Sequence, residues 1–420
     1  MQTQDPSEEL SAGLRASREF QDDGWLLGGH LAGPLADALG GRLAFQYKSN
    51  ANFWKVTPQR PVDPVVQITN PERGESSVDG RATFQWDVAD ALGLNLKVAY
   101  SNYRNDGANQ NADVQCIDPG NPQTTYYPAI PGLGRSWPSG YDCDLFDGEH
   151  PMGDVHPLTG TGLDTRIPFV DSKIVFTRVL ADYRIADAFT LTSVTGYFGL
   201  GEQGLDNYTY DANGFGTGRT ENITRAFSQE LRLSSELDFF LNFTAGLYFQ
   251  KQRKEFNTSQ VVLGVALLPE PLGGLDADTG NGFDWTKNHG TDALAYSGFL
   301  SFSAYLMDDL ELAGGARWTR EEKENIVEVP YMHDAFENPA LRAALPNLAT
   351  EGFRTDPIEF DDQNWSPEVS LKYAVTDRVN VYGAYKTGFK SGGIDNSALL
   401  TNVSDEAIAD LVFDSETAKG

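Results

Sequence analysis

The stretch FSQELRLSSELDFFLNFTAGLYFQ, from Phe227 to Gln250, decides the fold class of this chain. Its first half alternates between apolar and polar side chains, with Phe227, Leu231 and Leu233 opposite Ser228, Glu230, Arg232 and Ser234. Its second half alternates in the same way from Leu241 onward, and the short acidic segment ELDFF separates the two halves. Alternation with a period of two over about ten residues is typical of a β-strand that has one apolar face. The stretch therefore predicts two antiparallel strands joined by a tight turn.

The same unit recurs along the chain. Five further acidic segments have alternating runs on both sides: PLADALG (34–40), VADALG (88–93), IADAF (185–189), LMDDL (306–310) and AVTDRV (374–379). Each has Asp near its centre, and the Asp carboxylate suits tight turns because it accepts hydrogen bonds from backbone N–H groups two residues on. The pattern predicts about thirteen strands, with a fourteenth that begins near Glu416.

The connections between these hairpins are much longer and are rich in Gly, Pro, Asn and Asp. We expect loops near 50–77, 104–171, 201–221, 253–291, 322–362 and 390–414. All tight turns then lie at one end of the sheet and all long loops at the other, an asymmetry that outer-membrane barrels have. The prediction is an all-β, antiparallel, up-and-down transmembrane β-barrel with short periplasmic turns and long extracellular loops. The alternative is a soluble β-sandwich or propeller with long loops.

Composition excludes several other classes of protein. The 420 residues include 60 Asp and Glu but only 32 Lys and Arg, a formal net charge of -28. Nucleic-acid binding needs the opposite balance, because basic side chains must neutralise phosphates. The longest apolar piece, VVLGVALL (261–268), ends at Pro269 and is far shorter than the roughly 18 residues of a spanning helix. The opening MQTQDPSEEL lacks a signal-peptide pattern, so we expect an exported chain to carry its signal further upstream.

Several segments together resemble the β-barrel of a TonB-dependent outer-membrane receptor. They are GPLADALGGRLAFQYKSNANFW, TLTSVTGYF, FSQELRLSS, LNFTAGLYFQKQ, LAGGARWTREEKE and NWSPEVSLKYAVTDRVNVYGAYKTGFKSGG. The resemblance implies a barrel of about 22 strands around a plug domain. This sequence starts at a first barrel strand near 7–18 and stops at about the fourteenth strand. We therefore expect all of 1–420 to be part of one barrel domain, truncated at both ends and without the plug.

The resemblance also implies a function. It implies active transport of a bulky, scarce nutrient across the outer membrane of a Gram-negative bacterium, above all a ferric siderophore or another iron complex. The partners would be outer-membrane lipid and the TonB–ExbB–ExbD complex, which would act through the missing plug. Two alternatives stay open: a passive porin-like channel and a secreted all-β carbohydrate-binding or adhesive protein. We expect no enzyme, catalytic residue, cofactor or nucleic-acid partner, because the five His residues are scattered and no nucleophile–base constellation is present.

The largest expected loop, 104–171, holds the candidate ligand-binding residues. These are the aromatic side chains Tyr126, Tyr127, Trp137, Tyr141 and Phe146. Aromatic rings beside polar groups suit a siderophore or a sugar, by stacking and hydrogen bonding, and the alternative is that the loop packs on itself. Cys116 and Cys143 lie in the same segment. In an oxidising compartment they predict a loop-closing disulfide, and the alternative is two unrelated thiols.

Two further sets of side chains have less specific interpretations. His150, Met152, Asp154 and His156 could ligate a metal, but their spacing matches no zinc motif and we expect a solvated loop without a metal site. Seven charged residues fall on the polar faces of the predicted strands: Lys97, Glu230, Arg232, Glu311, Arg317, Glu368 and Lys372. We expect them to face a water-filled lumen and to pair across strands.

Overall fold

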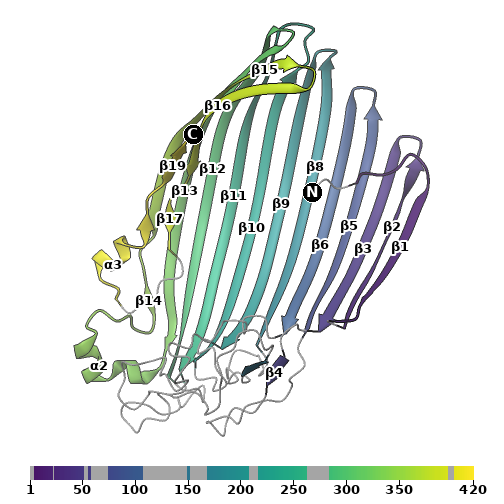
Figure 1. Ribbon diagram of the computed structural model, residues 1–420. Coiled ribbons are helices and arrows are strands. Elements are labelled where there is room, and N and C mark those ends of the chain that lie inside the picture. The colour runs from purple at the N-terminus through teal and green to yellow at the C-terminus, as the bar shows by residue number, and fades with distance from the viewer. Residues whose placement is uncertain are drawn as a thin grey trace.

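One curved antiparallel sheet makes up most of the protein. The computed structural model describes residues 4–21, 23–51, 55–57, 74–106, 149–151, 168–207, 216–262, 283–395 and 402–420. Figure 1 shows the strands side by side in chain order. The main path consists of β1 (Ser11–Glu19), β2 (Gly24–Ala36), β3 (Leu39–Ala51), β5 (Gly74–Ala89), β6 (Leu92–Asp106), β8 (Phe169–Ala186), β9 (Phe189–Asn207), β10 (Gly216–Ser235), β11 (Leu241–Val262), β12 (Phe283–Met307), β13 (Leu310–Met332), β15 (Ile358–Thr376), β16 (Val379–Lys390) and β19 (Glu416–Lys419).

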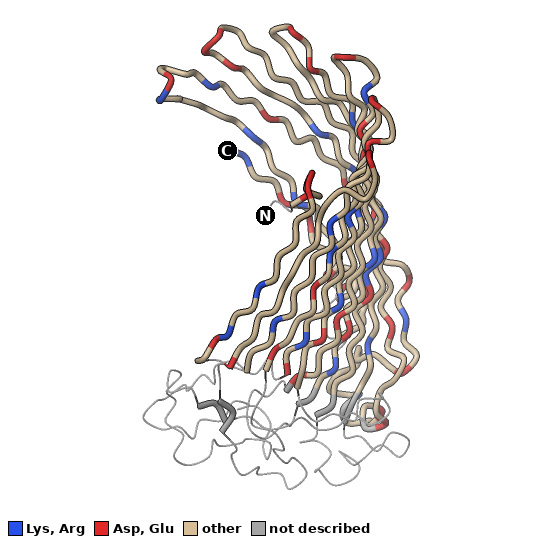
Figure 2. Tube along the Cα trace, turned by 90° about the vertical axis from the view of Figure 1, so that its right-hand side faces the viewer, with Lys and Arg blue, Asp and Glu red and all other residues tan. Residues whose placement is uncertain are grey.

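The up-and-down topology confirms the predicted fold class. Each acidic segment that predicted a tight turn connects two neighbouring antiparallel strands, as at residues 37–38 between β2 and β3. The last strand of the path begins at Glu416, where the fourteenth strand was expected. Among the described residues β1 pairs only with β2, and β19 pairs only with β16, so the sheet is not closed. Figure 2 shows it from the side as a curved wall with an open gap.

The two faces of the sheet differ in polarity, as the alternation predicted. Leu231 of β10 lies opposite Leu247 of β11, and Trp318 of β13 lies opposite Trp365 of β15. Leu231, Leu247 and Trp365 are exposed, with Leu247 67% and Trp365 65% accessible, and Trp318 is half-buried. Exposed apolar side chains in register across many strands need a cover other than water, and a bilayer supplies one. The opposite face holds the polar partners of the alternation.

The strands extend further than the expected loop boundaries. β11 continues to Val262, β12 begins at Phe283 and β13 continues to Met332, inside segments that were expected to be loops. The extensions of β11 and β12 are mostly polar on both faces, whereas the end of β13 carries the buried apolar residues Val327 and Val329. The backbone ladder continues there because its hydrogen bonds do not depend on which side chains project from the sheet.

The structure describes two connections at the end of the sheet away from the tight turns. The first follows β13 and contains the 3-10 helix η2 (Asp334–Glu337), α2 (Pro339–Ala344) and β14 (Phe353–Arg354), which pairs with β13. The second follows β16 and contains β17 (Gly393–Ile394), α3 (Asp405–Ala409) and β18 (Val412–Phe413). A separate short parallel pair joins β4 (Lys55–Thr57) to β7 (Glu149–Pro151).

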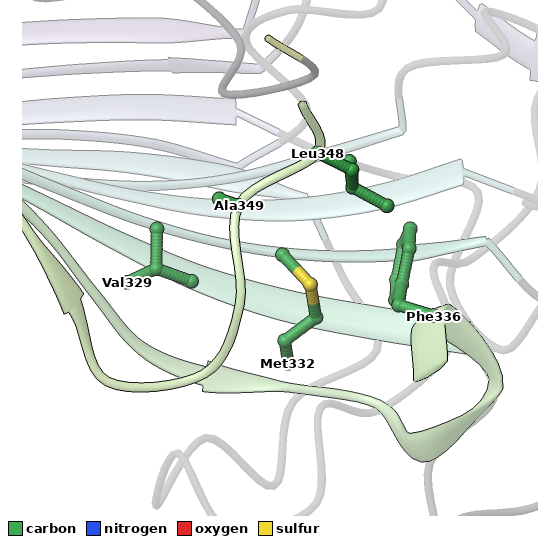
Figure 3. Close-up of a cluster of buried hydrophobic side chains, with 5 residues drawn as sticks. All are labelled: Val329, Met332, Phe336, Leu348 and Ala349. Carbon is green, nitrogen blue, oxygen red and sulfur yellow. The ribbon is translucent and has the colours of Figure 1, made fainter. Parts of the chain in front are cut away.

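The first connection has a small hydrophobic core of its own. Figure 3 shows its five side chains gathered at the end of β13: Val329, Met332, Phe336, Leu348 and Ala349. Trp285 of β12 packs against this cluster, with its ring edge-on to Phe336 at 5.9 Å between centroids. Val403 of the second connection also packs here, and its N–H donates to the Asn347 carbonyl at 2.7 Å. The two connections therefore form one packed cap. Within the described residues no helix is long and apolar enough to cross a membrane.

Candidate functional site

The polar face of the sheet is the candidate functional surface. The seven charged residues that were expected to face a lumen all lie on this face. On each strand they alternate with the apolar side chains, which project from the other face of the sheet. Neighbouring strands pair several of them: Lys372 with Glu311 at 3.7 Å and Lys386 with Glu368 at 2.9 Å. Lys97 forms a 2.7 Å ion pair with Asp5, which precedes β1. Cross-strand pairing of this kind stabilises the sheet.

Arg317 forms an aromatic and polar cluster in the middle of this wall. Its guanidinium lies over the rings of Tyr248 and Phe299, at 5.3 and 5.7 Å from their centroids. It also donates to the Ser297 hydroxyl at 3.0 Å. Room for the Phe299 ring comes from Gly246 on the neighbouring strand, where any side chain would collide with that ring. The cluster holds a cation at the lumen surface by cation–π contact rather than by a carboxylate.

A second polar group is buried at the capped end of the wall. It consists of Thr258 on β11, Lys287, His289 and Thr291 on β12, and Asn325 on β13. The register places Thr258 opposite Lys287 and Asn325 opposite Thr291, and the Asn325 amide donates to the Thr291 hydroxyl at 2.7 Å. Lys287 and His289 are each only 2% exposed. These residues lie far from the tight turns, beyond the roughly ten residues of each strand that a bilayer core requires.

Several polar atoms of this group have no hydrogen-bond partner among the described residues. They are both ring nitrogens of His289, the hydroxyl of Thr258 and the amide oxygen of Asn325. Buried polar atoms without partners are uncommon in folded proteins, because each costs part of its hydration free energy. The group is therefore a place where the wall can accept further hydrogen bonds.

Burial and neighbouring charge control the protonation of this group. Burial lowers the pKa of Lys287 to about 8, and Asp395 of the second connection opposes that shift. Burial, and then the nearby Lys287 cation, lower the pKa of His289 to about 3, again opposed by Asp395. His289 is therefore neutral across the physiological range, and Lys287 loses its charge more readily than an exposed lysine.

Lys323 of β13 attaches the second connection to the wall. Its ammonium donates to the Ser391 hydroxyl at 2.9 Å and to the Gly392 carbonyl at 2.5 Å. It also lies 5.3 Å from the centroid of the Phe360 ring. The Gly392 N–H donates to the Ser415 hydroxyl at 2.9 Å, which in turn donates to Asp362 of β15. These bonds hold the backbone of 391–395 across the inner face of β13 and β15.

The arrangement offers buried hydrogen-bonding groups and charge near the second connection. Among the described residues no cluster of three His, Cys, Asp or Glu side chains could hold a metal ion. Lys287 and His289 are both buried in the wall, and the exposed Asp395 of the second connection interacts electrostatically with each of them.

The residues that the sequence proposed as a ligand site cannot be compared with this wall. Tyr126, Tyr127, Trp137, Tyr141, Phe146, Cys116 and Cys143 lie outside the described residues, as do Met152, Asp154 and His156. His150 is placed only as part of β7. Sequence reasoning missed Lys287, His289 and Lys323 as a group. The run KNHGTDA (287–293) has no apolar alternation, and His289 was one of five scattered histidines.

Comparison with known proteins gives one family match and several structural matches. The family model described as "TonB dependent receptor-like, beta-barrel" matches residues 120–419. No match is found among the curated proteins. The ferric yersiniabactin uptake receptor FyuA from Yersinia pestis has 13% identity and a TM-score of 0.67, and the match covers 99% of this chain and 52% of that one.

Two further solved structures have the same fold. The siderophore receptor PiuA from Acinetobacter baumannii has 11% identity and a TM-score of 0.61, covering 99% of this chain and 54% of that one. The ferric-catecholate import receptor Fiu from E. coli K12 has 17% identity and a TM-score of 0.54, covering 94% and 53%. The chain thus spans about half the length of these structures, and at such low identity the likeness shows the fold alone.

Proposed function

The chain belongs to the TonB-dependent receptor β-barrel family, and from this premise we propose that it forms part of an outer-membrane receptor that imports a bulky iron complex. The ligand class we propose is a ferric siderophore. Energy for import would come from the TonB–ExbB–ExbD complex, acting through a plug domain of the complete receptor. The cell would be a Gram-negative bacterium.

One observation supports this proposal above all others. The sheet combines an exposed apolar outer face with a polar inner face, and the connections described after β13 and β16 pack together at the end away from the tight turns. An apolar exterior fits a bilayer, and a polar interior fits a lumen that admits water and a hydrophilic ligand. The structures named above are receptors for ferric yersiniabactin, a siderophore and ferric catecholates, which supports the same ligand class for this chain.

The capped end of the wall supports a binding role. Lys287, His289 and Asn325 offer buried donors and acceptors beneath a connection that Lys323 straps down. A bulky ligand that is first held by the extracellular loops would contact this part of the wall as it passes from the loops into the lumen. The aromatic residues of 104–171 remain the proposed first contacts: Tyr126, Tyr127, Trp137, Tyr141 and Phe146.

The test is uptake of radiolabelled iron. The complete polypeptide, as its own cell makes it, is expressed in a host that lacks siderophore receptors of its own, with and without functional TonB. We expect one class of ferric siderophore to restore uptake only when TonB is present. Uptake of small solutes that does not depend on TonB would favour a passive channel. A product that stays soluble without detergent and binds sugars would favour a secreted adhesive protein. Either result would overturn the proposal.

A further inference from the structure

Basic side chains gather on the inner face of the sheet between β3 and β8. In the register, Arg42 of β3 lies opposite Thr83 of β5, which lies opposite Lys97 of β6. Lys97 lies in turn opposite Arg178 of β8. Arg81 precedes Thr83 by two residues on β5 and therefore projects from the same face. We name Arg42, Arg81, Lys97 and Arg178 the basic patch.

The charge of the basic patch has little compensation within the sheet. Elsewhere on the inner face a cation lies beside a carboxylate, as Arg232 does beside Glu230 at 3.5 Å. Within the part of the chain that the structure describes, Lys97 is the one member of the patch that has an ion pair, with Asp5 at 2.7 Å. Lys97 also lies directly opposite Arg178, and like charges in this position destabilise a sheet. In a chain with a net charge of -28, such a concentration of cations indicates an anionic partner.

Several polar atoms of the patch are open to further hydrogen bonds. The Nε atoms of Arg42, Arg81 and Arg178 are buried and have no hydrogen-bond partner among the described residues. Thr83 lies between Arg42 and Lys97 with 0% of its surface exposed, and its hydroxyl has no such partner either. Buried polar atoms without partners are uncommon, because each loses part of its hydration free energy. An anion bound at the patch would supply acceptors for these donors.

The polar neighbours of the patch position it without neutralising it. The Arg178 guanidinium donates to the amide oxygen of Asn95 at 2.7 Å, and an amide carries no net charge. Asp79 lies two residues from Arg81 on the same face of β5, and it accepts a hydrogen bond from the Ser101 hydroxyl at 2.6 Å. The neighbours therefore hold the guanidinium groups in place and leave their positive charge available.

Asp5 shows which chemical group the patch accepts. Its carboxylate lies 2.7 Å from the Lys97 ammonium, at one end of the patch. The segment reaches this position along Gly40 of β3, where an added Cβ atom would lie 2.9 Å from Pro6. The Asp5 side chain is 50% exposed, whereas that of Lys97 is 12% exposed. A half-exposed carboxylate is held weakly, so another carboxylate can take its place.

We propose that the basic patch binds a polycarboxylate anion on the inner face of the sheet. One carboxylate lies between the guanidinium groups of Arg42 and Arg81 and accepts from the Thr83 hydroxyl. A second lies between Lys97 and Arg178, where it replaces Asp5. The planar fork of an arginine matches the geometry of a carboxylate. The inference rests on the proposed function in one respect: the carboxylates would belong to the iron complex that crosses the lumen.

The test measures binding of radiolabelled citrate, with and without ferric iron, by equilibrium dialysis. Citrate is the probe because it is a small anion that carries several carboxylates, and the protein is the complete polypeptide, purified from outer membranes in detergent. We expect saturable binding that weakens as salt is added. Arg42→Gln and Arg81→Gln should each weaken it about tenfold, because each removes a charged donor to a carboxylate.

Asp5→Asn should have the opposite effect. It removes the carboxylate that competes for Lys97, so we expect binding to become about threefold tighter, the effect of a partly exposed ion pair. A residue that only stabilises the sheet would not improve binding when it is replaced. Unchanged or weaker binding by Asp5→Asn would contradict competition at Lys97 and overturn the proposal.

Arg232→Gln is the matched control. It removes an arginine of the same inner face that already has Glu230 as its partner at 3.5 Å, and it should bind citrate like the unsubstituted protein. Heat-modifiable migration on gels confirms that each variant is folded. Three results would overturn the proposal: no saturable binding of citrate, equally tight binding of inorganic phosphate, or the same loss of binding in Arg232→Gln as in Arg81→Gln.

Binding and iron uptake are measured separately, so failure of the site and failure of the proposed function are distinguishable. Citrate binding that depends on Arg42 and Arg81, in a protein that imports no iron, would support the site and overturn the proposed function. TonB-dependent iron uptake by a protein in which Arg42→Gln and Arg81→Gln leave citrate binding unchanged would support the function and overturn the site.

Discussion

Lys323 of β13 donates a 2.5 Å hydrogen bond to the carbonyl oxygen of Gly392, across 69 positions of the sequence. The bond joins the wall of the sheet to the connection that follows β16. A charged donor strengthens such a bond beyond a neutral one, and the bond replaces water on a backbone carbonyl that the sheet ladder does not use. This hydrogen bond fixes the connection that follows β16 to the inner face of the sheet.

Replacing Lys323 with Met should loosen this connection. The variant keeps the length of the side chain but removes the donors to Ser391 and Gly392. A hydrogen bond to a charged group contributes about 1.5–3 kcal/mol, so we expect amide exchange in 391–395 to accelerate at least tenfold. Hydrogen exchange followed by mass spectrometry measures this. Lys372→Met, near a tight turn, is the control. Equal acceleration of amide exchange in 391–395 in both variants would contradict the role of Lys323 in holding this connection.

Phe336→Ala should separate the cap from the sheet. The ring is 8% exposed and meets Trp285 edge-on. Deleting a buried Phe side chain costs about 3–5 kcal/mol, which is large for a cluster of five buried side chains. Limited proteolysis should then cut within 333–357, while the strands stay protected. Leu345→Ala, at a residue that is 39% exposed, should leave the cleavage pattern unchanged.

His289 should make the protein less stable in acid. Its pKa is about 3 in the folded protein and 6.5 in an unfolded chain. Between these values the unfolded chain binds a proton that the folded protein does not, so stability falls as the pH drops below 6.5. The loss is about 2 kcal/mol at pH 5, from about 1.4 kcal/mol per pH unit.

The measurement is the urea midpoint in detergent, at pH 7.5 and pH 5, for the protein and for His289→Gln. The variant should lose less stability between the two values, because its side chain does not titrate. Lys287 affects stability over a different pH range. Its pKa is about 8 in the folded protein and 10.5 in an unfolded chain, so its contribution to stability becomes more favourable only as the pH rises from 8 to 10.5. If the protein and His289→Gln lost the same amount of stability between pH 7.5 and pH 5, protonation of His289 would not be the cause of the acid sensitivity.

Gly315→Val should destabilise the sheet. A Cβ atom at this position of β13 would lie 2.8 Å from the carbonyl oxygen of Leu300 and 3.1 Å from Ser301 on the next strand. Backbone atoms cannot move aside without breaking the ladder, so overpacking should cost about 1–3 kcal/mol. Gly383→Val on β16 places the same side chain in open space and should fold like the unsubstituted protein. Heat-modifiable migration on gels compares the folded fractions, and equal fractions would contradict the clash.

A polypeptide of residues 1–420 alone should not give a monodisperse, water-soluble monomer. β1 and β16 each expose a backbone edge along most of their length, and the outer face is apolar. Unpaired edges and a bare apolar face both promote association. Light scattering after refolding without detergent tests this. A single soluble monomer would argue against a membrane-facing sheet.

The alternation of side chains was sufficient to predict most of the sheet. The segment ELDFF between Leu233 and Leu241 predicted a hairpin, and β10 and β11 pair around it in register. Prediction works here because a strand with one face in lipid and the other toward water must alternate, and because a tight turn leaves its two strands no other partner. The family was suggested separately, by the resemblance of several segments to TonB-dependent receptors, and the family match over residues 120–419 confirms it.

Only the tertiary structure brought Asp395 near Lys287 and His289, and Lys323 into contact with Ser391 and Gly392. The outer part of β12 is mostly polar on both faces, as in KNHGTDA (287–293), so its sequence carries no alternation to mark it as strand. The segment from Ser391 to Asp395 reaches the wall through side-chain and backbone hydrogen bonds that no local pattern encodes. The sequence alone therefore determined the architecture of the sheet, since burial of apolar faces is periodic. The tertiary structure decided the polar clusters, since they depend on contacts between residues far apart in the chain.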